Sequence, residues 1–207
     1  MKRLAVFAGI FAALGAPACA LLTKSEPLDP RYFTVEPEVN PSPPVAAPAE
    51  LSVRLGPVTA GSEIRQNLVV RNGAHELSFS EEQRWTEKPE AYLRRALSHE
   101  LFETRGVKRV VSGPSLTVEL ELVSFEEVVR PTGNVARVVA TMILHDERVV
   151  REEKTLTVEV PIEHAKEKEH QDDSVRALAT ALERVVSQIA DEVCRSPSPP
   201  AVAAEGR

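Results

Sequence analysis

The sequence predicts an α+β fold, a two-layer sandwich in which two amphipathic helices pack on one face of an antiparallel sheet. Two observations lead to this fold class. Between residues 51 and 160, several short segments alternate apolar and polar side chains, which is typical of strands with one buried and one solvated face. Residues 89–102 and 172–193 instead repeat apolar side chains at three- and four-residue spacing, as amphipathic helices do. Each helix must bury its apolar stripe, so both are expected to cover the apolar face of the sheet.

The composition is that of one globular domain with tails: the chain has 207 residues, of which 43% are hydrophobic and 27% are charged. The formal net charge is -6. Binding to nucleic acid needs clustered Lys and Arg side chains that neutralise phosphates. The acidic balance of this chain therefore argues against nucleic acid as a partner.

Residues 1–18 have the organisation of an export signal. Lys2 and Arg3 supply a positive start, and an uncharged apolar run over residues 4–14 follows, which is too short to span a bilayer. Small residues then lead to the first cysteine. We therefore expect residues 1–18 to be a lipoprotein signal peptide that is removed during export.

The residue after the leader, Cys19, is the predicted site of lipidation. A lipoprotein signal places a small residue directly before the modified cysteine, and Ala18 fits that pattern. Cleavage by ordinary signal peptidase is the alternative, because Ala16-Pro17-Ala18 also fits an Ala-x-Ala site. Lipidation is favoured because cysteine is rare in this chain, and acyl chains on Cys19 would hold the protein firmly on a membrane. Ala20, rather than Asp, follows the cysteine, which indicates the outer membrane.

Residues 19–50 are expected to form a Pro-rich tether between this anchor and the domain. The segment has no apolar periodicity and cannot bury enough surface to fold by itself. Residues 31–35 are the exception, because Tyr32, Phe33 and the two β-branched residues after them are typical of a strand. We expect this short segment to add an edge strand to the domain.

The folded domain is predicted over residues 51–195. Its clearest strand is 116–122, where Leu and Val alternate with Thr and Glu. This strand and two later ones are expected to form an antiparallel meander. Asn72-Gly73 is a strong signal for a hairpin turn. Strands are predicted at residues 51–58, 64–71, 75–80, 107–111, 116–122, 135–144 and 148–160.

Two helices complete the predicted domain. The first begins near Pro89, because proline is tolerated in the first turn, where its missing N–H would have no intrahelical partner. The second follows a cap at Asp172, Asp173 or Ser174, and its apolar stripe is the most regular in the sequence. Residues 196–207, which contain three prolines, are expected to be a disordered tail.

The motifs give no catalytic, metal or cofactor site. The sequence has no Gly-rich phosphate loop, no Gly-x-Ser-x-Gly turn and no cysteine pair with metal spacing. His99-Glu100 begins like the helix of a zinc protease, but the second histidine that such a helix needs is missing. Cys194 is the only other cysteine. It is expected to be a half-buried free thiol at a helix end, with an intermolecular disulfide as the alternative.

Arg84 and Trp85 stand where the strand pattern gives way to the first helix, and Trp85 is the only tryptophan. Two interpretations stay open. A single tryptophan beside a helix start is most often a core anchor, which would hold the helix on the sheet. In the alternative, Arg84 and Trp85 organise that helix and border a groove for a partner.

Taken in order, the recognisable features are Cys19, residues 31–35, Arg84-Trp85, Ser124-Phe125-Glu126 and a final helix rich in Ala and Leu. This order resembles the ABC-type transport auxiliary lipoprotein family, the PqiC-like proteins. The resemblance covers roughly residues 19–193, nearly all of the chain after the leader. It lies in the order and spacing of the features, since no single motif is specific.

The resemblance implies a non-enzymatic lipoprotein on the periplasmic side of the outer membrane of a Gram-negative bacterium. Family members accompany an ABC permease, its ATPase and MCE-type substrate-binding proteins in lipid transport between the two membranes. The implied partner is an MCE-type periplasmic protein, with a second copy of this chain as a further one. Arg84, Trp85, Tyr32 and Phe125 are the residues expected to bind the partner or to support the fold that binds it. The alternative is a secreted periplasmic enzyme or inhibitor of a class that the motifs do not identify.

Overall fold

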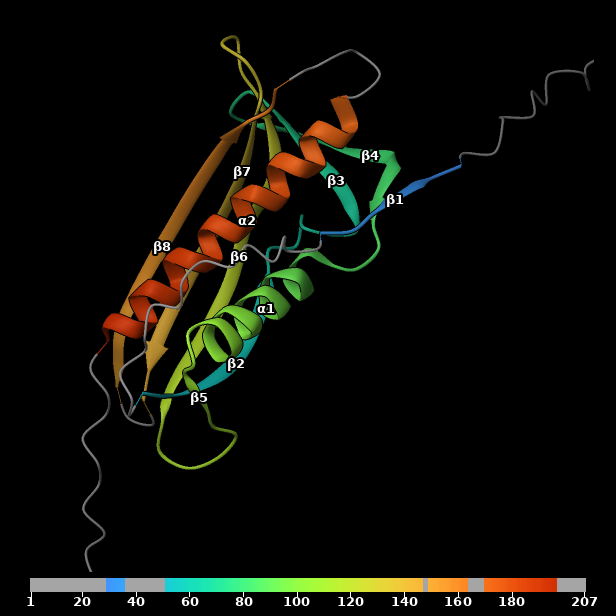
Figure 1. The fold of residues 1–207 in the computed structure, drawn as a ribbon. Coiled ribbons are helices and arrows are strands. Elements are labelled where there is room, and N and C mark those ends of the chain that lie inside the picture. The colour runs from blue at the N-terminus through green and yellow to red at the C-terminus, as the bar shows by residue number, and fades with distance from the viewer. Residues whose placement is uncertain (1–28, 36–50, 147–148, 164–169, 197–207) are drawn as a thin grey trace, which may run out of the picture.

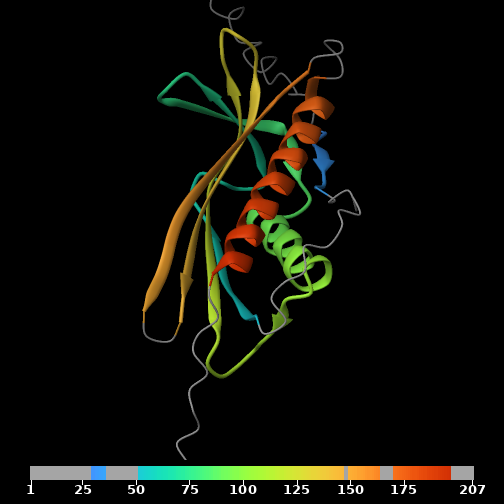
Figure 2. The same cartoon turned by 60° about the vertical axis from the view of Figure 1, so that its left-hand side comes forward.

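A sheet and two helices form two layers in the computed structural model, which describes residues 29–35, 51–146, 149–163 and 170–196 (Figure 1). The predicted signal peptide, Cys19 and all but the first residue of the predicted tail lie outside these ranges. Both helices lie on the same side of the sheet, as the turned view in Figure 2 shows. The predicted α+β class is confirmed. No helix within the described ranges combines the length and the apolar character needed to cross a membrane.

The elements follow one another in nearly the predicted order. The part of the chain that the structure describes contains β1 (Arg31–Phe33), β2 (Ser52–Ala60), β3 (Asn67–Asn72), β4 (Glu76–Trp85), α1 (Pro89–His99), the π-helical turn η1 (Glu100–Thr104), β5 (Lys108–Arg109), β6 (Leu116–Val129), β7 (Val135–His145), β8 (Val150–Pro161) and α2 (His170–Arg195).

The strand β6 is the centre of the sheet. On one side it pairs with β7 in the antiparallel direction, and β8 continues from β7, so the predicted meander is confirmed. On its other side β6 pairs first with β2 and then with β3, both in the parallel direction. The sheet is therefore mixed, and the prediction of an antiparallel sheet is wrong for these pairs. Two parallel neighbouring strands must be joined by a long crossover connection. Here the connection from β3 to β6 contains β4 and α1, and the local alternation of apolar and polar residues does not reveal it.

A bulge extends β6 beyond its predicted end. The pairing register with β7 shifts between Leu122 and Ser124, where the apolar alternation of the sequence stops. A bulge inserts one residue into a strand without ending it. After the shift, Phe125 pairs with Val138 and is 2% exposed. The bulge thus returns an aromatic side chain to the core beneath the helices.

The helices begin close to their predicted positions. Pro89 opens α1, as predicted, and the helix continues into η1, whose last turn closes when the N–H of Arg105 donates to the carbonyl of Glu100 at 2.9 Å. The start of α2 is His170, before the predicted cap. Asp172 and Asp173 lie in its first turn instead, where carboxylates oppose the positive end of the helix dipole.

The core lies between the two helices and the sheet. The even-numbered residues of β7 from Ala136 to Leu144 are all fully buried, while its odd-numbered residues are only partly buried. The apolar stripe of α2 packs on this face, and α1 packs beside α2 on β2 and β6. The fully buried residues of the two helices include Leu93, Leu97, Leu178, Val185, Ile189, Ala190 and Val193.

Candidate partner-binding surface

Three aromatic side chains join β4, α1 and β6 at the point where the sequence changes from strand to helix. Trp85 is 1% exposed. Its ring centroid lies 5.2 Å from that of Phe125 at an interplanar angle of 63°, and 6.2 Å from that of Tyr92 at 77°. These are edge-to-face arrangements, which aromatic pairs prefer. The cluster therefore sets the position of α1 on the sheet.

The hydroxyl of Tyr92 connects this cluster to β1. It lies 2.8 Å from Thr86 Oγ1, accepts the backbone N–H of Glu87 at 3.1 Å and lies 3.4 Å from the carbonyl oxygen of Phe33. The backbone N–H of Thr86 also donates to that carbonyl at 2.8 Å. The predicted strand around residues 31–35 is confirmed, and these bonds tie it to the connection between β4 and α1.

The pairing of β1 with β4 divides the candidate site residues between two faces. The strands run parallel, with Tyr32 opposite Arg84 and Phe33 opposite Trp85. Tyr32 is 61% exposed and Arg84 is exposed, so these two residues share the solvent side of the strand pair. Trp85 and Phe125 lie together in the core. Two of the four candidates therefore form a surface, and the other two support it.

A shallow groove begins at this surface. Arg84 lines it, together with Arg65 from the connection between β2 and β3, and Lys88 and Glu90 from the start of α1. Its volume is about 490 Å³. Trp85 is not among the lining residues. The exposed side chains around the groove are thus mainly cationic, which suits an acidic partner surface.

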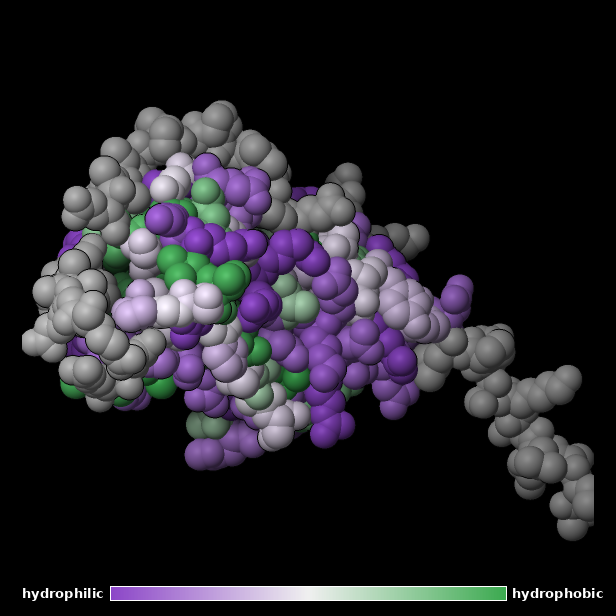
Figure 3. All heavy atoms as spheres, turned by 90° about the horizontal axis from the view of Figure 1, so that it is seen from below, coloured by the Kyte–Doolittle hydropathy of each residue, from purple (hydrophilic) through white to green (hydrophobic). Residues whose placement is uncertain are grey.

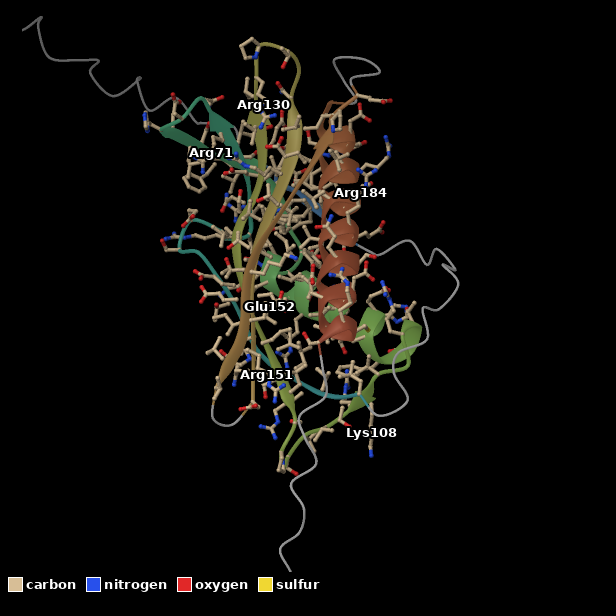
Figure 4. The ribbon with its side chains drawn as sticks, turned by 90° about the vertical axis from the view of Figure 1, so that its left-hand side faces the viewer. Arg71, Lys108, Arg130, Arg151, Glu152 and Arg184 are labelled. Carbon is tan, nitrogen blue, oxygen red and sulfur yellow. The ribbon has the colours of Figure 1, made fainter. Side chains whose placement is uncertain are left out.

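The opposite face of the sheet, which carries no helix in Figure 2, holds a buried carboxylate. Glu126 of β6 is 3% exposed and receives Arg71 Nε at 2.8 Å and Arg137 Nη2 at 2.5 Å. Burial disfavours the charged form of Glu126, but the hydrogen bonds from Arg71 and Arg137 outweigh it, so the pKa of this carboxyl lies below its usual value. Figure 4 labels Arg71 on this side of the molecule, away from α2. The network joins β3, β6 and β7.

The described residues offer neither a cluster of metal ligands nor an activated thiol. They contain no group of three or more His, Cys, Asp and Glu side chains that could hold a metal ion. His99 Nδ1 lies 2.9 Å from Glu103 Oε2, but both side chains are largely exposed. Burial raises the pKa of the Cys194 thiol, which lowers its thiolate fraction and its reactivity.

Sequence reasoning missed two features. The hydrogen-bonding role of the Tyr92 hydroxyl depends on Phe33, which lies 59 positions away. The only local signal is a tyrosine six residues after Thr86. A second groove, lined by arginines of β2, α1 and β5, was also missed. Its members come from three elements, so no local motif contains them.

The fold is shared with proteins of known structure. A crystal structure of a protein from Xanthomonas campestris has a TM-score of 0.65 and 16% identity, with 77% of this chain and 92% of that chain covered. A structure of an uncharacterised protein has a TM-score of 0.61 and 12% identity, covering 80% of this chain and 99% of that one. A hypothetical protein from Chlamydia trachomatis has a TM-score of 0.51 and 11% identity, covering 72% and 100%.

The model of one protein family matches residues 33–190, more than half of the chain. That family is described as the ABC-type transport auxiliary lipoprotein component. No match was found among curated protein sequences. The matched range begins at the last residue of β1 and ends in α2, so it contains Arg84 and both grooves but not Tyr32.

Proposed function

Since the chain belongs to the ABC-type transport auxiliary lipoprotein family, we propose that it is a non-enzymatic lipoprotein on the periplasmic side of the outer membrane. There it binds the MCE-type periplasmic protein of an ABC transport system that moves lipids between the two membranes. The protein acts by holding its partner near the outer membrane.

One observation carries this proposal: the segment that leads away from the anchor is itself part of the candidate binding surface. β1 is bound to β4 through residues 31–33 and presents Tyr32 beside Arg84. Strand edges bind partners through unpaired backbone groups, and exposed aromatic and arginine side chains are frequent anchors in interfaces. β1 pairs only with β4 in the described part of the sheet, so its other edge is open to a strand of a partner or of a second copy.

The distance to the membrane supports the same function. Cys19, the proposed lipid site, stands twelve residues before Arg31. A chain of this length spans at most about 40 Å when extended. Because β1 is fixed to the domain, this short segment sets the reach of the anchor. The domain, with its Tyr32 and Arg84 surface, is then held within tens of ångströms of the bilayer.

In-cell photo-crosslinking tests the proposal. A photoreactive amino acid at Tyr32 or at Arg84 is expected to capture an MCE-type periplasmic protein or a second copy of this chain. Arg184 is the matched control, because it is exposed and lies on α2 about three helical turns beyond Asp172, which pairs with Arg31 of β1. The control position is expected to capture neither.

Two results would overturn the proposed function. The first is that no component of an envelope transporter is captured from Tyr32 or Arg84 while the protein is present in the membrane fraction. The second is that the purified protein turns over a substrate, which would favour the periplasmic enzyme considered from the sequence.

A further inference from the structure

The groove between α1 and the strands β2 and β5 gathers four arginines. Arg54 of β2, Arg94 and Arg95 of α1, and Arg109 of β5 line it, and Glu87 is the one carboxylate among its described lining residues. Its volume, about 600 Å³, falls within the range of small-molecule binding sites. The chain as a whole carries a net charge of -6, so the sign of the charge is reversed at this groove.

Two of the four guanidinium groups are held by backbone carbonyls. Arg54 Nη2 donates to the carbonyl of Gly113 at 2.6 Å, and Arg94 Nη1 donates to the carbonyl of Gly56 at 2.7 Å. A carbonyl orients a guanidinium but does not neutralise its charge. Each group also keeps further N–H donors, since an arginine carries five.

The other two arginines differ in how far their charge is compensated. Arg109 donates to the hydroxyl of Ser98 and lies over the ring of Phe102, 4.3 Å from its centroid, so its partners are both neutral. Arg95 Nη1 donates to both carboxylate oxygens of Glu87 at 3.1 Å. One ion pair therefore leaves three positive charges at the groove that no carboxylate among the lining residues balances.

Apolar side chains complete the lining. Leu55, Ala91, Val110 and Val111 border the same groove, and Val111 is 84% exposed. In the view from below in Figure 3, the hydrophobic surface occurs as small areas bordered by hydrophilic residues. An exposed valine beside unneutralised arginines favours a ligand with one anionic and one apolar part, because covering the valine adds to binding.

We propose that this groove binds the phosphate headgroup of an anionic phospholipid, with the start of its acyl chains against Val110 and Val111. The planar guanidinium fork matches phosphate oxygens in a bidentate manner. The phosphate site rests on the arginines alone. The choice of a lipid over a soluble phosphate rests on the apolar border and on the proposed function.

An acidic segment of a partner protein is the competing occupant. A protein segment would gain most from backbone pairing with a strand edge. Of the two strands at this groove, β5 spans only Lys108–Arg109, and the Gly56 carbonyl of β2 is already bound by Arg94, so little backbone is offered for such pairing. The short strand edge therefore favours a headgroup over a protein segment.

The test measures binding of short-chain lipids that stay monomeric in water. The full exported chain carrying Cys19→Ala is titrated by calorimetry with dihexanoyl phosphatidylglycerol. Dihexanoyl phosphatidylcholine has the same chains without net charge, and glycerol 3-phosphate has the phosphate without chains. A Glu-rich peptide represents an acidic protein segment. Phosphatidylglycerol is expected to bind at least about tenfold more tightly than each of the others, because the choline cation is repelled by the arginines, glycerol 3-phosphate cannot cover the apolar border, and the peptide carries no phosphate.

Three variants and one control locate the site. Arg94→Gln and Arg109→Gln are each expected to weaken phosphatidylglycerol binding about tenfold. Glu87→Gln removes the carboxylate and is expected to strengthen binding several-fold, a gain that misfolding cannot produce. Arg184→Gln, on α2 and apart from the labelled Lys108 of β5 in Figure 4, is expected to bind as the parent does.

Each other outcome overturns a defined part of the proposal. Unchanged affinity in all three variants overturns the phosphate site, and equal binding of phosphatidylcholine, whose phosphate carries a choline cation, overturns the preference for an anionic lipid. If glycerol 3-phosphate binds as tightly as phosphatidylglycerol, the ligand is a soluble phosphate and not a lipid. If the Glu-rich peptide binds more tightly than phosphatidylglycerol, the ligand is an acidic protein segment. These measurements use purified protein, so they fail or succeed independently of crosslinking to an MCE-type partner.

Discussion

Single buried side chains connect the sheet to α1, and Trp85 is the largest of those that are fully buried. Trp85→Ala is expected to lower the stability by about 3–5 kcal/mol, because it removes the ring on which Tyr92 and Phe125 pack. The melting temperature should then fall by about 10 °C. Arg84→Ala is the control, since this exposed neighbour should change stability by about 0.5 kcal/mol or less. If Trp85→Ala melts like the parent yet loses its partner, Trp85 acts in binding and not as a core anchor.

The buried carboxylate of Glu126 leads to a prediction about how the stability depends on pH. Its pKa in the folded protein lies below the ordinary value of 4.5. The ionised carboxylate therefore stabilises the fold fully above that ordinary value, and this contribution is lost as the pH falls through the lower folded value. Glu126→Gln is expected to reduce the stability at pH 7 by about 1–3 kcal/mol, since it leaves Arg71 and Arg137 without their carboxylate.

Melting curves between pH 7 and pH 3 check this expectation. The parent should lose more stability on acidification than Glu126→Gln does, because the variant has no carboxylate to protonate at that position. Glu121→Gln, an exposed change on the same strand, serves as the control and should follow the parent. A parallel decline of the parent and Glu126→Gln would contradict the assigned role of Glu126.

At the scale of elements, one arginine connects the two helices. Arg105 follows η1 and is 7% exposed. Its Nε donates to Glu100 Oε1 at 2.7 Å, and its Nη1 donates to Asp191 Oδ1 of α2 at 2.6 Å. The side chain thus couples the end of the first helical segment to the last turns of α2, where no strand separates them.

Arg105→Met keeps the apolar stem of the side chain and removes both ion pairs. It is expected to cost about 1–3 kcal/mol in urea unfolding and to speed hydrogen exchange in the last turns of α2. Glu103→Gln removes an exposed pair with His99 at the end of α1 and should cost about 0.5 kcal/mol or less. Equal losses in the two variants would show that the contact between helices adds nothing beyond a surface ion pair.

At the scale of the whole molecule, the anchor decides where the binding surface acts. The exported protein is expected to begin at an acylated Cys19, and Cys19→Ala is expected to move it from the outer-membrane fraction to the soluble periplasmic fraction. Intact mass and fractionation measure the two effects. Cys194→Ala should stay with the membrane, because its thiol is partly buried on α2. A mass that starts at Cys19 without lipid, or a Cys19→Ala protein that remains in the outer membrane, would argue for cleavage by ordinary signal peptidase.

The sequence by itself determined the features that depend on local periodicity. Pro89 opens α1, residues 135–144 form a strand with one buried face, and Tyr32 lies in a short edge strand. Such features follow from the geometry of the chain, since 3.6 residues make a helical turn and strand side chains alternate. A resemblance based on the order of these elements identified the family correctly.

Apart from the predicted meander, tertiary structure alone decided which strands pair and in which direction, because these pairings join residues far apart in the chain. The parallel pairing of β6 with β2 and β3 and the bulge that turns Phe125 inward are of this kind. The groove with Arg54, Arg94 and Arg109 is another, since three separate elements bring their charges together. In the sequence each of these arginines looks like an ordinary surface residue. Only the packing of α1 on β2 makes them one site.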